Sequence, residues 1–245
     1  MVKTRGLDPD RPANILRYRM VTIALGLLLA AAPGGSLDFG WQHETGVMSR
    51  ATVTVSAWFP VTDRLALDAG AGFSLFEHRG LAAWGAGARF TFIERWRIAA
   101  RVACQHEQWN DWRAGENRVI GTVQARPFRP VELEIGLAWR APVFDPETYW
   151  SPLAWSSDVP ELNIVYRLDW RFLEGPGWDV SVGAASFDGL HLRNPQHAGL
   201  YLVGRHRLDD GWRLFGRFGT AVKGVSSPLL SADGFTARLG VERDF

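Results

Sequence analysis

The sequence of 245 residues contains a single cysteine, Cys104. One cysteine excludes an intrachain disulfide and any metal site of the Cys-x-x-Cys kind. The sequence also lacks an apolar run of about 18 residues, which is the usual minimum for a membrane-spanning helix. Its longest apolar run, residues 21–32, is 12 residues long. These absences exclude disulfide scaffolds, metal proteins of that cysteine type and helical membrane proteins.

The apolar run at residues 21–32 follows Arg17 and Arg19 and leads into small residues. A basic stretch, a short apolar core and an alanine-rich exit are typical of a secretory signal peptide, and a buried core helix is the alternative. Cleavage is expected after Ala32 or close to Ser36. We therefore divide the chain into a signal peptide with its upstream segment, residues 1–36, and a mature domain, residues 37–245.

The charge of the chain is close to balanced. The whole sequence has 27 basic and 26 acidic residues, which gives a formal net charge of +1. Residues 1–36 contain five of the basic and two of the acidic residues, so the remainder carries 22 and 24, a net charge of −2. This balance gives no reason to expect a nucleic-acid partner.

The mature domain consists of segments in which apolar and polar side chains alternate. Such segments of about ten residues, separated by turn residues, are the strand pattern of a transmembrane β-barrel. In residues 161–173, for example, Leu162, Ile164 and Leu168 share one face, and Arg167 and Asp169 share the other. The twelve predicted strands are residues 37–43, 50–61, 64–78, 82–93, 95–109, 118–128, 131–142, 161–173, 178–187, 198–208, 212–223 and 234–245.

The lengths of the connections give an independent test of this pattern. Outer-membrane barrels have short turns at the periplasmic end and longer loops outside. The connections expected at the periplasmic end are short: residues 61–63, 94, 129–130, 174–177 and 209–211. The external ones are longer, except residues 79–81. The sequence therefore predicts an all-β fold, an up-and-down antiparallel barrel of about twelve strands with both termini on one side.

The last segment alternates up to the C-terminal Phe245. A closing strand that ends in an aromatic residue is typical of barrels in the outer membrane of Gram-negative bacteria, where the assembly machinery reads it. We therefore expect this location, with barrel-assembly machinery, outer-membrane lipids and lipopolysaccharide as partners. The alternative is a soluble all-β protein, which would turn its apolar faces inward.

Arginine dominates the faces that would line the barrel interior. Arginine–carboxylate pairs could cross-link and fill this interior, because buried charges need partners. Alternatively, an arginine ladder lines a water-filled path that favours anions. The excess of arginine favours the second interpretation, a narrow anion-preferring path, and no cofactor or metal is expected. The arginines predicted to line the lumen are Arg89, Arg97, Arg101, Arg126, Arg140, Arg167, Arg171, Arg205, Arg213, Arg217 and Arg238.

The start of the mature domain, Leu37-Asp38-Phe39 followed by His43-Glu44, is similar to the start of a known porin family. Together with the mature length, the twelve strands and the arginine-lined interior, it resembles the oligogalacturonate and sialic-acid porins of enteric bacteria. The resemblance implies a channel or porin for transport of small anionic or sugar-like solutes, with the lumen arginines as hypothetical binding residues.

A lipid-modifying enzyme is the alternative function, because some outer-membrane barrels are lipid hydrolases with a serine and a histidine on the lipid-facing surface. Their motif places serine and asparagine two and three residues after the histidine. In His191-Leu192-Arg193-Asn194, arginine replaces the serine, so no nucleophile is positioned. His43 and His106 are expected to point outward near the external rim, without a serine on the same face of their own strands.

The longest external connection, residues 143–160, holds several aromatic residues and no basic one. Aromatic faces in a loop can stack on sugar rings, pack over the barrel mouth, or anchor in lipopolysaccharide. We expect Tyr149, Trp150 and Trp155 to serve one of these roles. A plugged structural or adhesive barrel is the third function that the sequence leaves open.

Overall fold

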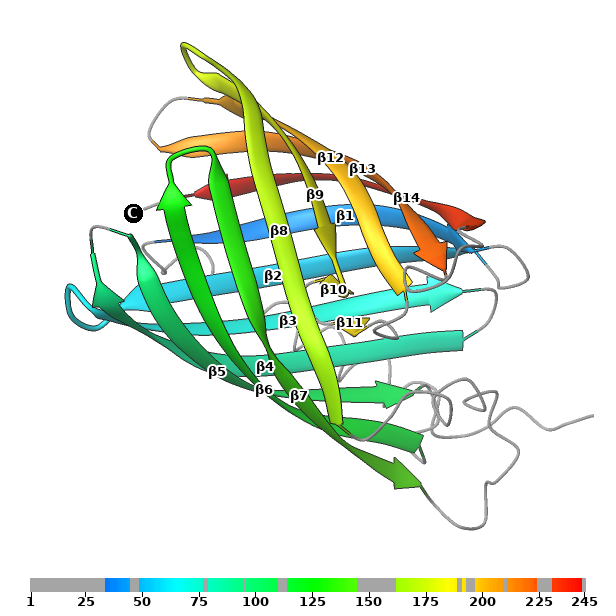
Figure 1. Cartoon of the computed structure of the whole chain (residues 1–245). Coiled ribbons are helices and arrows are strands. Elements are labelled where there is room, and N and C mark those ends of the chain that lie inside the picture. Colours follow the sequence, from blue (N-terminus) through cyan, green and yellow to red (C-terminus); the bar gives the residue numbers. More distant parts are fainter. Residues whose placement is uncertain are drawn as a thin grey trace, which may run out of the picture.

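The computed structural model of the chain is a closed barrel of twelve antiparallel strands, with a separate two-stranded sheet (Figure 1). The predicted all-β transmembrane barrel is confirmed. No helix among the described residues is long and apolar enough to cross a membrane. The structure describes residues 34–44, 49–76, 79–94, 96–109, 114–144, 162–188, 191–192, 197–208, 211–223 and 231–243.

Each barrel strand corresponds to one strand predicted from the sequence, and each pairs with its neighbours in an antiparallel register. The β1–β14 pair closes the barrel. The barrel strands are β1 (Gly34–Glu44), β2 (Arg50–Pro60), β3 (Leu65–Phe76), β4 (Arg79–Ile93), β5 (Ile98–Trp109), β6 (Ala114–Phe128), β7 (Val131–Phe144), β8 (Leu162–Gly175), β9 (Trp178–Ala185), β12 (His197–Arg207), β13 (Trp212–Lys223) and β14 (Ser231–Arg243).

Several strand boundaries differ from the prediction. Pairing with the adjacent strand extends some strands past the residues in which apolar and polar side chains alternate. β6 begins at Ala114 rather than at residue 118, since Glu116 lies opposite Glu107 on β5. β1 begins at Gly34, three residues before the expected start, since Gly34 lies opposite Trp58. The remainder of the predicted signal peptide lies outside the described residues, as does Phe245.

The expected external connection at residues 188–197 contains a small sheet instead of loop alone. Its strands, β10 (Phe187–Asp188) and β11 (His191–Leu192), pair with each other. Ser186, which precedes β10, donates its backbone N–H to the carbonyl oxygen of Tyr166 at 3.0 Å, and its Oγ accepts from the N–H of Tyr166 at 2.9 Å. This residue therefore ties the end of β9 to β8 where the barrel ladder stops.

The connections β2–β3, β4–β5, β6–β7, β8–β9 and β12–β13 are short and lie at one end of the barrel, as predicted. The connection between Phe76 of β3 and Arg79 of β4, at the opposite end, is also short and is the exception that the sequence indicated. Gly177 and Gly211 have φ angles of 82° and 79°, a left-handed conformation that glycine adopts most readily. The pairing of Gly35 with Arg243 places the start of β1 and the end of β14 at this short-turn end.

Apolar side chains point out of the barrel, and polar ones point in. On the outer surface Ile135 is 63% exposed and Phe218 is 61% exposed, whereas the inward-facing Val165 is 1% exposed. A soluble barrel would show the reverse arrangement, so that alternative is wrong. The belt of outward aliphatic and aromatic side chains matches a hydrocarbon environment, and it bears out the predicted location in a bacterial outer membrane.

Candidate functional site

A cavity of about 1110 Å³ occupies the half of the barrel that carries the short turns. Twelve arginines and eight carboxylates line it, an excess of four positive charges. The arginines are Arg89, Arg97, Arg101, Arg126, Arg129, Arg167, Arg171, Arg205, Arg207, Arg213, Arg217 and Arg238. The carboxylates are Asp38, Asp68, Glu132, Glu134, Asp169, Glu174, Asp179 and Glu242.

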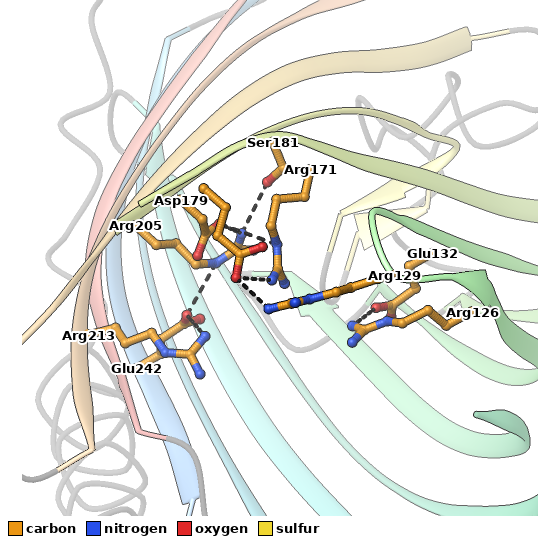
Figure 2. A network of polar contacts seen from close by, with 10 residues as sticks. Arg126, Arg129, Glu132, Arg171, Asp179, Ser181, Arg205, Arg213 and Glu242 are labelled. Carbon is orange, nitrogen blue, oxygen red and sulfur yellow. Dashed lines mark hydrogen bonds and ion pairs between the residues drawn. The ribbon is translucent and has the colours of Figure 1, made fainter. Parts of the chain in front are cut away.

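On one wall of the cavity the charges form a continuous network, which Figure 2 shows. The Arg205 guanidinium lies 3.2 Å from a carboxylate oxygen of Asp179 and 3.2 Å from one of Glu242. It also donates to the Ser181 hydroxyl at 3.1 Å. Arg213 approaches Glu242 at 3.8 Å, so that carboxylate is shared by two arginines. Positive and negative groups alternate here, and the network largely neutralises itself.

The network continues along β8 and β9 toward the short-turn mouth. Arg171 lies 3.9 Å from Asp179 and 3.7 Å from Glu174. The Glu174 carboxylate accepts a hydrogen bond of 3.1 Å from Arg129, in the turn between β6 and β7. The guanidinium groups on this wall are therefore held in place by shared carboxylates.

Across the barrel, Arg101 on β5 makes a bidentate pair with Asp68 on β3, with distances of 3.1 and 2.6 Å. The pair passes over Gly87 of the intervening strand β4. A Cβ on Gly87 would lie 2.9 Å from the Asp68 Oδ1 atom, so the absence of a side chain there leaves room for the pair. Bidentate geometry fixes the orientation of a guanidinium more firmly than a single contact does.

An aromatic side chain interrupts the charges in the middle of the barrel. The Tyr201 hydroxyl donates to Asp169 at 2.8 Å, and the Arg217 guanidinium lies 3.6 Å from the centre of the Tyr201 ring. A cation over an aromatic face is held by the ring's negative face. Tyr201 therefore orients both a cation and an anion of the cavity wall.

A second group of charges is buried on the wall formed by β5, β6 and β7 in the external half of the barrel. Arg118 pairs with Glu107 at 2.8 Å and with Glu116, and Arg140 donates through Nε to Glu116 at 2.8 Å. The side chains of Arg118 and Arg140 are 3% and 5% exposed. We call these four residues the buried ionic cluster. The sequence left two arrangements open for the charges of the barrel interior. In the external half the charges form packed ion pairs, and in the short-turn half they line a cavity.

Ten of the eleven arginines predicted to line the lumen line the cavity. The exception is Arg140, which lies in the buried ionic cluster. The prediction did not include Arg118. This residue lies an even number of positions from Arg126 in the same strand, so the alternation of side chains places both on the inner face. Tyr149, Trp150 and Trp155 lie outside the described residues.

Two histidines lie on the outer surface near the external rim, as expected. The His43 Nδ1 atom is 2.8 Å from the Ser49 hydroxyl, and its ring is 5.6 Å from that of Phe235. Strand periodicity did not reveal this serine, because it lies in the segment before β2. Among the described residues, no third side chain is recorded on the other ring nitrogen of His43, and no cluster of three or more potential metal ligands occurs.

The second histidine has different partners. His106 packs on Trp84 with ring centres 4.6 Å apart. Its ring nitrogens lie 2.7 Å from the Asn117 Oδ1 atom and 2.9 Å from the Gln108 Oε1 atom. Both nitrogens thus contact amide oxygens, and this arrangement positions no nucleophile.

No protein-family model and no curated protein matches the sequence. Solved structures do match. The chain is similar to the KdgM porin, with 10% identity, a TM-score of 0.54 and coverage of 86% of this chain and 99% of that one. It is similar to an outer membrane channel from Pseudomonas putida F1, with 11% identity, a TM-score of 0.57 and coverage of 87% and 96%.

Outer membrane phospholipase A from Escherichia coli is also similar, with 9% identity, a TM-score of 0.50 and coverage of 87% and 98%. These identities are low, so the likenesses concern the fold. They confirm, at that level, the resemblance to small twelve-stranded porins. The chain thus shares its fold with outer-membrane barrels that include both channels and a lipid hydrolase.

Proposed function

We propose that this protein is an outer-membrane channel for small anionic or sugar-like solutes. The observation that carries the proposal is the excess of four arginines over carboxylates around the cavity. Fixed positive charge in a confined, low-dielectric lumen lowers the energy of an anion and raises that of a cation. The cavity therefore favours anions over cations of the same size.

The side chains of β2 to β4 support this interpretation, because they leave space beside the charged groups. Ser56, Gly70 and Gly85 line the cavity and are small and uncharged. Trp58 and Phe215 add aromatic surface to the same cavity. A path bordered by small polar groups, arginines and aromatic rings suits a solute that carries both hydroxyl groups and negative charge.

The buried ionic cluster limits the size of the path. Arg118 and Glu107 are almost completely buried, so a solute that passes their level displaces them or moves beside them. We therefore expect a narrow channel with a small conductance rather than a wide porin. Permanent closure at this level would make the protein a plugged barrel.

The experiment is conductance of the purified protein in a planar bilayer with a salt gradient. We expect small channels whose reversal potential shows anion preference. Arg89→Gln combined with Arg207→Gln should weaken that preference, because the structure gives neither side chain a salt bridge among the described residues. Thr54→Ser in the same cavity is the neutral control. Cation preference, or no conductance, would contradict the proposal.

One observation favours a second candidate, a lipid hydrolase. The Ser49 hydroxyl lies 2.8 Å from a ring nitrogen of His43, on the outer side of the barrel, and a serine–histidine contact can activate a nucleophile. The test is hydrolysis of phospholipid in mixed micelles. Activity that Ser49→Ala abolishes and Ser56→Ala preserves would support an enzyme, and absence of activity would exclude this candidate.

A further inference from the structure

Two arginines of the cavity wall differ from most of their neighbours. Arg89 and Arg97 line the cavity, but no carboxylate lies within 4.0 Å of either guanidinium in the part of the chain that the structure describes. Both side chains are exposed. Their charge is therefore available to a ligand, unlike that of Arg101 or Arg205, which is shared with carboxylates.

The register brings these two arginines close to other cations. Arg89 on β4 lies directly opposite Arg101 on β5, and directly opposite residues of adjacent strands have Cβ atoms about 4.5–5.5 Å apart. Arg97 immediately precedes β5, and the backbone N–H of Arg126 on β6 donates to the carbonyl oxygen of Trp96 at 2.8 Å. Four arginines thus gather where β4, β5 and β6 meet the short-turn end.

Two of these four arginines are paired with carboxylates among the described residues. Asp68 pairs with Arg101 at 2.6 Å, and Glu132 pairs with Arg126 at 2.7 Å. Each carboxylate is held in one pair, which leaves a local excess of two positive charges on Arg89 and Arg97. The rest of the cavity lining, with eight arginines and six carboxylates, also has an excess of two, but there several arginines share carboxylates such as Asp179 and Glu242.

The backbone at Arg97 gives an independent indication that an arginine side chain matters there. Its φ angle is 46°, and it is the only residue other than glycine with a positive φ among those described. Glycine or asparagine fits this left-handed conformation with less strain. A strained residue next to a cavity is a reasonable marker of function when other observations agree.

We propose that Arg89 and Arg97, with Arg101 beside them, form a binding site for a doubly charged oxyanion: inorganic phosphate or a small phosphomonoester. Two unpaired guanidinium groups match two negative charges, and the planar donors of arginine suit tetrahedral oxyanions. The site deepens the proposed function, because it gives the channel a binding step at its short-turn mouth. That mouth faces the periplasm in barrels of this kind.

Calorimetric titration of the detergent-solubilised barrel tests this site. Inorganic phosphate and glycerol phosphate are titrated separately, with potassium chloride adjusted to constant ionic strength. We expect saturable binding, and a loss of affinity of about tenfold in Arg89→Gln and in Arg97→Gln, because each removes a charge-assisted contact. A response to only one of the two anions identifies whether free phosphate or a phosphomonoester is the ligand.

Arg207→Gln is the matched control, because Arg207 lines the same cavity and also has no described salt bridge. It lies on β12, six strands around the barrel from β4. If it weakens binding as much as the other two changes do, the general field of the lumen binds the anion and the site is wrong. Absence of saturable binding would overturn the site as well.

The same preparation separates this proposal from the proposed channel. Anion-selective conductance without phosphate binding overturns the site and leaves the channel intact. Phosphate binding without conductance supports the site and overturns the proposed channel. Heat-modifiable mobility identifies folded variants, and Arg89→Lys, which keeps the charge, replaces Arg89→Gln if that variant does not fold. The ammonium group of lysine lacks the planar set of donors of a guanidinium group, so the lysine variant should bind phosphate more weakly than the wild-type protein.

Discussion

The hydroxyl group of Tyr201 donates a hydrogen bond of 2.8 Å to the carboxylate of Asp169, although the two residues are on strands that are not adjacent. β9 lies between them, and it presents Gly183 at the same level. A Cβ on Gly183 would lie 2.5–2.6 Å from ring atoms and the hydroxyl of Tyr201. The Tyr201 ring can therefore cross β9 to reach Asp169 because this position has no side chain.

We predict that Gly183→Ala displaces the Tyr201 ring and destabilises the barrel by about 1–3 kcal/mol, which is typical of overpacking. The measurement is urea unfolding of the protein in detergent or lipid. Gly204→Ala is the control, since no atom lies within 4 Å of a Cβ at that position. Equal stability of the two variants would show that Tyr201 does not need the space over Gly183.

Substitution of the outer face should be costly. Ile135→Arg places a charge among lipid-facing side chains, and it should cost about 2–4 kcal/mol if the position is near the bilayer midplane. Gly136 is a poor inward control, because its Cβ would overlap the carbonyl oxygen of Gly121. Gln124→Arg, which points into the cavity, is the better one. If Gln124→Arg lowers the free energy of unfolding in lipid more than Ile135→Arg does, the assignment of the inner and outer faces is wrong.

The buried ionic cluster should depend on all of its members. Glu116→Gln removes the carboxylate that both Arg118 and Arg140 contact. Removal of one partner of a buried ion pair leaves an uncompensated charge and should cost about 3–5 kcal/mol in the free energy of unfolding. By contrast, Glu94→Gln breaks an exposed pair with Arg64 and should cost about 0–1 kcal/mol. Similar unfolding midpoints for the two variants would contradict the burial of the cluster.

Arg97→Gly should have opposite effects on stability and on binding. Glycine relieves the positive φ of 46° and should stabilise the fold by about 1 kcal/mol. The same change removes one of the two unpaired guanidinium groups, so phosphate affinity should fall. Unfolding and calorimetric titration of one preparation measure both effects. A less stable variant would mean that Arg97 makes contacts that stabilise the turn.

The sequence by itself determined the strands and their two faces. Side chains of a strand alternate between its two faces, and a bilayer requires the outer face of a barrel to be apolar. The pattern within each segment therefore shows which of its side chains face the lipid. Leu168 and Arg167 could be assigned to opposite faces without knowledge of any partner strand. The alternation of short and longer connections between strands can likewise be read from the sequence. It predicted that both termini lie on the same side of the barrel.

Only the tertiary structure decided which charges are paired and which are available to a ligand. Arg205 meets Asp179 on the preceding barrel strand and Glu242 on β14, and these contacts depend on register and on closure of the barrel. Alternation reports that an arginine faces inward, but it contains no information on which carboxylate lies at the same level. Arg140 and Arg89 therefore look alike in the sequence, whereas the register of the strands buries the first in an ion pair with Glu116 on the adjacent strand and leaves the second open to the cavity.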